Sequence, residues 1–177
     1  ESGNTETIKF IGKKFDRQRT IEIYKIANRI GLWTQACFVI GFPFEKLDSM
    51  QDTLKLAVDC QSDISVFNIA TPYPGTRLHE IFVTEGLLPR NKYVSQMIGG
   101  CNTKYFTANE IKNFADSYFG IFFSARIKQL LKNPFCLLPK IRCFEEIKYT
   151  LKIGYRFLIV FFNRIKFGSY SFTGLRR

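Results

Sequence analysis

The chain has 177 residues, enough for one domain with a buried core and an appendage. Its Lys and Arg residues number 26 against 15 acidic residues, and the net charge of +11 lies entirely in residues 91–177. The longest uninterrupted apolar run, 157–162, is far shorter than the roughly 20 residues that span a bilayer, so we expect no transmembrane helix.

The cysteines are odd in number, which excludes complete pairing within the chain. They are Cys37, Cys60, Cys101, Cys136 and Cys143, and no two of them form a CxxC or CxxxC pair. This spacing matches no metal motif and predicts reduced thiols in a cytoplasmic protein with no metal ligands of its own. Because the sequence begins with Glu1 and not with Met, we expect it to be the C-terminal part of a longer protein.

Helical and strand patterns alternate in the first half of the chain. The expected elements are a helix at 16–29, a buried strand at 34–43, a helix at 48–59 and a second buried strand at 64–70. Gly31 stands where the first helix should end, and Asp48 or Ser49 could cap the start of the second. Strand, helix, strand with short connections predicts a parallel α/β sheet, whose ligands bind beyond the carboxyl ends of the strands.

The second half is predicted to be mostly helical and begins with a connection at 86–101. Thr107 and Glu110 have the spacing of a capping box and open a helix that we expect to run to about residue 129. Pro134 and Pro139 indicate a turn, and an amphipathic helix is expected at 144–165.

Two stiff turns follow the predicted strands. Gly41, Phe42 and Pro43 end the first strand, where a glycine lets the backbone approach a flat ligand closely or simply makes a tight turn. Pro72-Tyr73-Pro74-Gly75-Thr76 follows the second strand and is a rigid loop under either interpretation. In order and spacing, ESG, FVIGFPFE and FNIATPYPGT together resemble the second half of the radical S-adenosylmethionine (SAM) barrel, a TIM-like fold.

The resemblance covers about residues 1–86 and is closest to members that carry a cobalamin-binding domain. It implies an α/β chain with the C-terminal half of a partial (β/α) barrel at 1–90 and a basic helical region at 91–177. The implied activity is reductive cleavage of SAM by a 4Fe-4S cluster to a 5′-deoxyadenosyl radical, in a cobalamin-linked methyltransferase or oxidoreductase. The CxxxCxxC loop that holds the cluster is absent, so the cluster ligands and the cobalamin domain would lie outside this chain, which alone would be inactive.

The resemblance also implies cofactor-binding positions, while it leaves the catalytic residues unknown. Those positions are Glu1 and Ser2 near the SAM ribose or methionine, Val39, Ile40 and Gly41 against the adenine, Glu45 ordering the loop, and Ala70, Thr71 and Pro72 beside the adenine. Tyr73 lies between prolines on the same face and could contact a substrate. His79, the single histidine, is expected to be a surface or partly buried helix residue without a metal.

Aromatic and basic residues alternate at helical spacing in the second half, and three interpretations compete. The region could pack on the barrel as a helical cap, bind an anionic membrane surface peripherally, or bind RNA, which is the least favoured because no RNA motif is present. The expected substrate is a small or lipid-linked molecule. The alternative to an enzyme is a non-catalytic membrane- or RNA-associated module on a degenerate barrel scaffold.

Overall fold

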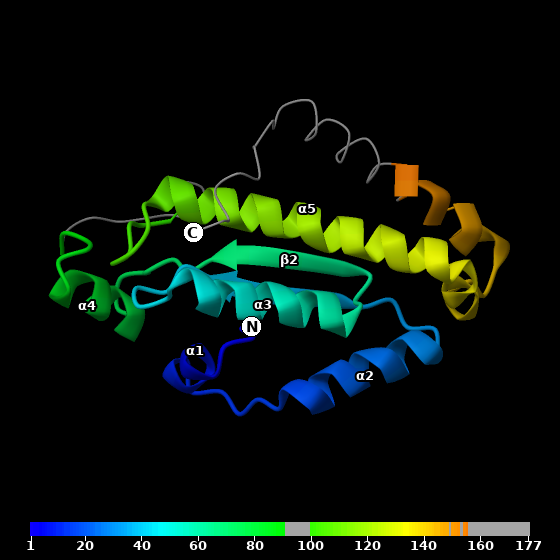
Figure 1. Cartoon of the computed structure of the whole chain (residues 1–177), viewed down its shortest axis with the longest axis horizontal. Helices are drawn as coiled ribbons and strands as arrows, with labels where there is room; N and C mark the ends of the chain where they lie inside the picture. The colour runs from blue at the N-terminus through cyan, green and yellow to red at the C-terminus, as the bar shows by residue number, and fades with distance from the viewer. Residues whose placement is uncertain (91–99, 149, 153, 156–177) are drawn as a thin grey trace.

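The computed structural model describes residues 1–90, 100–148, 150–152 and 154–155 (Figure 1). Its elements are α1 (Thr5–Phe10), α2 (Arg17–Arg29), β1 (Gln35–Ile40), α3 (Leu47–Cys60), β2 (Ile64–Ile69), α4 (Arg77–Thr84), α5 (Ala108–Lys132) and the 3-10 helix η2 (Pro134–Lys140). Figure 1 shows α5 lying along β2, α2 next to α3, and α4 beyond the arrowhead end of β2. The expected α/β class is confirmed.

The sheet is parallel, as the strand-helix-strand order predicted. β1 pairs with β2 in the register Val39 with Asn68 and Ile40 with Ile69. On the other side of β1, the Val39 N–H donates to the carbonyl oxygen of Glu1 at 2.8 Å, so the start of the chain lies beside the sheet. The described residues contain this two-stranded sheet and no complete barrel.

Local capping explains where most helices begin. The Asp16 side chain accepts a hydrogen bond from the Arg19 N–H at the start of α2, and Thr107 and Glu110 form the predicted capping box of α5. The predicted cap of α3 was wrong. Its N-cap is Lys46, whose side chain makes no capping bond, so neither Asp48 nor Ser49 has that role. Helix α1 and the 3-10 form of η2 had no predicted counterpart.

The core forms on one face of the sheet. Alternate strand residues Ala36, Phe38, Ile40 and Phe67 are buried together with side chains of α3 and α5, because successive side chains of a strand point to opposite faces. Gln35, Cys37 and Asn68 are exposed on the other face. Helix α5 thus shares a core with the first half, while the boundary between 1–90 and 91–177 stays a prediction.

The end of the chain is described in part. Residues 144–148, 150–152 and 154–155 are helical, in line with the helix predicted at 144–165, of which the remainder lies outside the described residues. Within the described residues, no helix is both long enough and apolar enough to cross a membrane.

Candidate functional site

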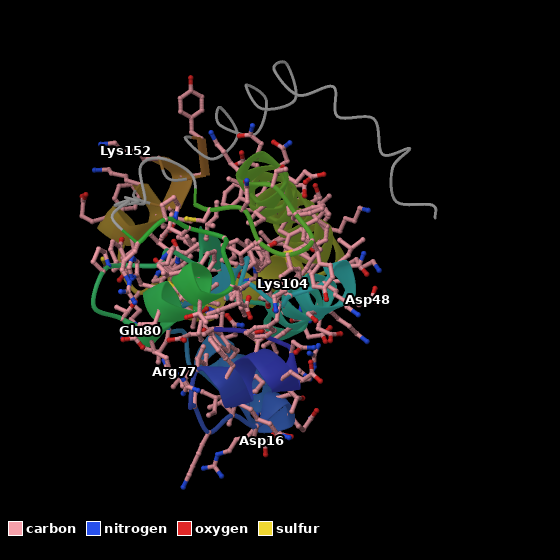
Figure 2. All side chains as sticks on the ribbon, turned by 90° about the vertical axis from the view of Figure 1, so that its left-hand side faces the viewer. Asp16, Asp48, Arg77, Glu80, Lys104 and Lys152 are labelled. Carbon is pink, nitrogen blue, oxygen red and sulfur yellow. The ribbon has the colours of Figure 1, made fainter. Side chains whose placement is uncertain are left out.

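An open cleft of about 350 Å³ lies at the carboxyl ends of the two strands. It is lined by Val39, Phe42, Asn68, Ile69, Ala70, Thr71, Tyr73 and Leu78. Its volume falls at the lower end of the roughly 300–1,000 Å³ typical of small-molecule sites. Figure 2 looks at the molecule from this end, with Arg77 and Glu80 of α4 and Lys104 toward the viewer.

Three of the residues expected to bind a cofactor line this cleft. Val39 is half-buried and lies on the open face of β1, directly beside Asn68 of β2. Ala70 follows β2, and its N–H donates to the Ile40 carbonyl at 2.8 Å. The Thr71 hydroxyl donates to the Ile69 carbonyl at 3.1 Å, which holds the first turn after the strand. These two hydrogen bonds attach the rim of the cleft to the ends of the strands.

Ile40 and Pro72 were also expected at a cofactor, but neither of them lines the cleft. Ile40 is 0% exposed and belongs to the core cluster, because its side chain points to the face opposite Val39. Pro72 is likewise fully buried. Because side chains alternate between the two faces of β1, Val39 lines the cleft while its neighbour Ile40 lies in the core. Pro72 is buried within the loop that follows β2.

The glycine at position 41 is explained by packing against another helix and not by the approach of a flat ligand. Its φ of +87° lies in the left-handed region that favours glycine. A Cβ at this position would lie 2.8 Å from Cγ2 of Ile111, which projects from α5. A side chain here would therefore clash with a helix of the same chain.

Glu45 orders the loop after β1 from the inside. Its side chain is 1% exposed and accepts hydrogen bonds from the N–H groups of Gly41 (2.8 Å) and Phe42 (3.1 Å) and from the Thr7 hydroxyl (3.0 Å). Burial raises the pKa of Glu45, and these three donors act in the opposite direction. The carboxylate accepts these bonds from the chain itself, so Glu45 supports the loop from inside and does not line the cleft.

Glu1 and Ser2 hold the start of the chain against the body. The Glu1 side chain forms an ion pair with Lys13, and its carbonyl bonds to β1. The Ser2 hydroxyl is buried 3.1 Å from that of Thr53 on α3 and also accepts from the Asn4 N–H at 3.1 Å. Both residues lie outside the lining of the cleft.

Sequence reasoning missed Asn68, Ile69 and Leu78, whereas Phe42 lies in a turn that had been singled out. Asn68 carried a readable signal, since it is a polar residue inside an apolar strand, at the alternation position that faces away from the core. Tyr73 had been singled out as a substrate contact, and its half-exposed ring lies at the rim. His79 is more buried than expected, at 8% exposed, and its Nε2 has no hydrogen-bond partner among the described residues.

The arrangement is thus a parallel α/β unit with an open, mostly apolar cleft where its strands end. No model of a known protein family matches the chain. It is 36% identical over 138 residues to an uncharacterized methyltransferase of Pyrococcus horikoshii. The aligned segment is 76% of this chain and 30% of that protein, so the chain spans less than a third of its relative's length.

This comparison overturns the radical SAM interpretation. The relative's name is that of a methyltransferase, which points to SAM-dependent methylation and gives no support to SAM cleavage, a 4Fe-4S cluster or cobalamin. Among the described residues, no group of three His, Cys, Asp or Glu side chains could hold a metal. Packing explains part of the motif that suggested the resemblance, because Gly41 accommodates Ile111, Pro72 is buried, and Glu45 closes its own loop.

Proposed function

We propose that this chain is part of a SAM-dependent methyltransferase and that the cleft at the strand ends binds the adenosine part of SAM. The observation that carries the proposal is the 36% identity to a protein named as a methyltransferase. In such an enzyme, SAM supplies a methyl group from its sulfonium to a nucleophile, leaving S-adenosylhomocysteine and releasing a proton when the nucleophile is protonated.

The lining of the cleft suits a nucleoside. Val39, Ala70 and Leu78 provide an apolar wall against which a purine can pack. The Tyr73 ring at the rim is free to stack on the base, a contact worth about 1–3 kcal/mol in nucleic-acid complexes. Because the carboxamide of Asn68 is exposed on the open face of β2, it can donate to and accept from a base edge or a ribose hydroxyl.

Among the residues first expected from the sequence, Val39, Ala70 and Thr71 are proposed as direct contacts. Gly41 and Glu45 are proposed to act indirectly, since they fix the turn that carries Phe42 to the cleft. Thr71 keeps a hydroxyl oxygen available as an acceptor, because its donated bond goes to the Ile69 carbonyl. This division gives the binding role to Val39 on the open face of β1 and to the two residues that follow β2.

The proposal is tested by calorimetric titration of the chain with S-adenosylhomocysteine, the stable product of methyl transfer. Tyr73→Ala removes the stacking ring and should weaken binding roughly tenfold. Asn68→Trp fills the cleft from an exposed strand position and should abolish binding without disturbing the core. Asn109→Ala changes an exposed asparagine of α5 outside the cleft and is the matched control.

Two negative results would have different meanings, one for the proposed function and one for the proposed binding site. Absence of binding to the unmodified chain would contradict the proposed function of this segment. Binding that survives Asn68→Trp would retain the function but move the nucleoside away from the cleft.

A further inference from the structure

The segment that follows α5 reverses the usual distribution of charged and apolar side chains. Lys140 in η2 is 1% exposed, whereas large apolar side chains of the same segment face solvent. Those side chains are Leu131, Phe135, Leu138, Phe144, Leu151 and Tyr155, each at least 60% exposed, and we call them the apolar surface. The segment that carries it follows the carboxyl end of α5, at the opposite end of that helix from α4 (Figure 1).

Polar contacts, not these apolar side chains, attach the segment to the body. The Lys140 ammonium forms an ion pair with Asp63 and donates to the Asn28 side chain at 2.6 Å. The Pro139 carbonyl oxygen packs against Gly31. A Cβ added at Gly31 would lie 2.0 Å from this oxygen. A helical cap that packed on the body would bury its apolar side and leave its lysines in water. Here the contacts of Lys140 and Pro139 hold the segment with its apolar side chains toward solvent.

Basic side chains surround the apolar surface. Exposed cations of the described segment are Lys128, Lys132, Arg142, Lys148 and Lys152, against the acidic Glu145 and Glu146. Phe144, Leu151 and Tyr155 have the spacing of one helix face. Lys148 follows Phe144 by one turn and pairs with Glu145 at 3.0 Å, and Lys152 lies beside this face. The Lys148 ammonium lies 5.2 Å from the centroid of the Phe144 ring, and Figure 2 shows Lys152 at the edge of the molecule.

We propose that this apolar surface and its basic rim form a docking site for an anionic lipid bilayer. Phenylalanine, leucine and tyrosine side chains can enter the boundary between headgroups and acyl chains. Long lysine side chains beside them extend to lipid phosphates, because their stems stay apolar while their ammonium groups remain hydrated. The proposal makes no assumption about methyl transfer. Docking here would leave the cleft at the other end of the strands accessible.

Charge and shape favour a bilayer over RNA or another protein. From residue 120 onward the sequence has 12 basic residues and 2 acidic residues. Arg126 and Lys140 are buried against Asp63, but the remaining basic residues still far outnumber the acidic ones, which suits a surface of many anionic headgroups. RNA would also satisfy the charge, and Phe135, Phe144 and Tyr155 offer rings for stacking. The equally exposed aliphatic residues Leu131, Leu138 and Leu151 offer none, and they suit the acyl region of a bilayer better than a base. A protein partner would need acidic side chains placed opposite each lysine, whereas lipid headgroups can rearrange around them.

The test is co-sedimentation of the whole chain with vesicles of phosphatidylcholine alone or mixed with phosphatidylserine, at low salt and after nuclease treatment. Binding to the mixed vesicles is expected, with little binding to neutral ones. Lys148→Gln with Lys152→Gln removes two cations, each worth about fivefold near an anionic surface, so the partition coefficient should fall roughly 30-fold. Leu151→Ser removes an inserting side chain and should lower it about tenfold.

Matched controls use the same chemistry elsewhere on the protein. Lys25→Gln with Lys55→Gln removes two exposed lysines from α2 and α3, and Ile23→Ser removes an exposed aliphatic side chain from α2. Each control should change partitioning by less than about threefold, since screened charges away from the membrane contribute little. Three results would overturn the proposal: no binding to phosphatidylserine vesicles at low salt, binding that nuclease abolishes, or equal losses in the test and control variants.

Discussion

Asp63 is expected to be the most sensitive charged residue for the stability of this fold. It lies just before β2, and its carboxylate is shared by Arg126 of α5 at 3.0 Å and by Lys140 of η2. The N–H and hydroxyl of Thr34 also donate to it, at 2.8 and 3.0 Å. The three charged side chains are each at most 9% exposed, so water cannot replace a missing partner.

Asp63→Asn keeps the size of the side chain but leaves two buried cations without a counter-charge. Breaking a buried ion pair by removing one partner costs about 3–5 kcal/mol, so we expect a loss of about 4 kcal/mol in the free energy of unfolding. Lys140→Met should cost less, about 1–2 kcal/mol, because Arg126 and Thr34 still satisfy the carboxylate. Burial lowers the pKa of Lys140, an effect that Asp63 opposes, so removing this ammonium also removes a desolvation cost.

Urea denaturation followed by circular dichroism at neutral pH measures both losses. Asp59→Asn is the matched control, since Asp59 forms an ion pair with Arg17 at 2.9 Å but both side chains are about one-third exposed. An exposed pair of this kind contributes at most about 1 kcal/mol. If Asp63→Asn cost no more than Asp59→Asn, or less than Lys140→Met, the argument from burial would be refuted.

Three further predictions concern the loop after β1 and the core. Glu45→Ala leaves three donors without their acceptor and should lower the free energy of unfolding by about 3 kcal/mol. Glu45→Gln keeps most of these bonds and should cost less than half as much. Equal losses of the two variants in urea denaturation would contradict the bonding described. Gly41→Ala should cost about 2 kcal/mol by the same assay, because of its positive φ and the Ile111 side chain, and an unchanged midpoint would show that the turn is not constrained. Burial raises the pKa of Cys60 to about 11, above the usual 9.0. The stability that this thiol contributes is therefore complete below pH 9.0 and is lost as the pH rises toward 11. Melting temperatures measured across that interval should fall less steeply for Cys60→Ala than for the parent chain, and identical slopes would refute the assignment.

Local signals in the sequence predicted the elements well where a few neighbouring residues decide the structure. Thr107 and Glu110 cap α5 because both hydrogen bonds form within four residues, and Gly31 adopts the positive φ expected after a helix. The predicted start of α3 was wrong for a related reason. Asp48 had the right chemistry for a cap, but the helix begins one residue before it, without a side-chain cap, after a turn that Glu45 closes.

Long-range contacts could not be predicted in this way. The ion pair between Asp63 and Lys140 joins residues 77 apart, and no pattern of spacing marks two such residues as partners. Gly41 was predicted to let a flat ligand approach or to make a tight turn, whereas the group that a Cβ there would meet is Ile111, on a helix far along the chain. The strand-end rule pointed to the loops after the two strands, next to which the cleft lies, since it depends only on topology, whereas Val39 was expected only from the family resemblance.

The function was harder to predict than the fold, because a motif can be explained by packing as well as by a ligand. The most direct test of the proposed site is two-dimensional amide NMR of the isotope-labelled chain during titration with S-adenosylhomocysteine. The account predicts that the amide signals of Val39, Asn68 and Thr71 shift together, while those of Asn28 and Gln61 at the opposite end of the strands do not. No shifts, or shifts confined to that opposite end, would contradict it.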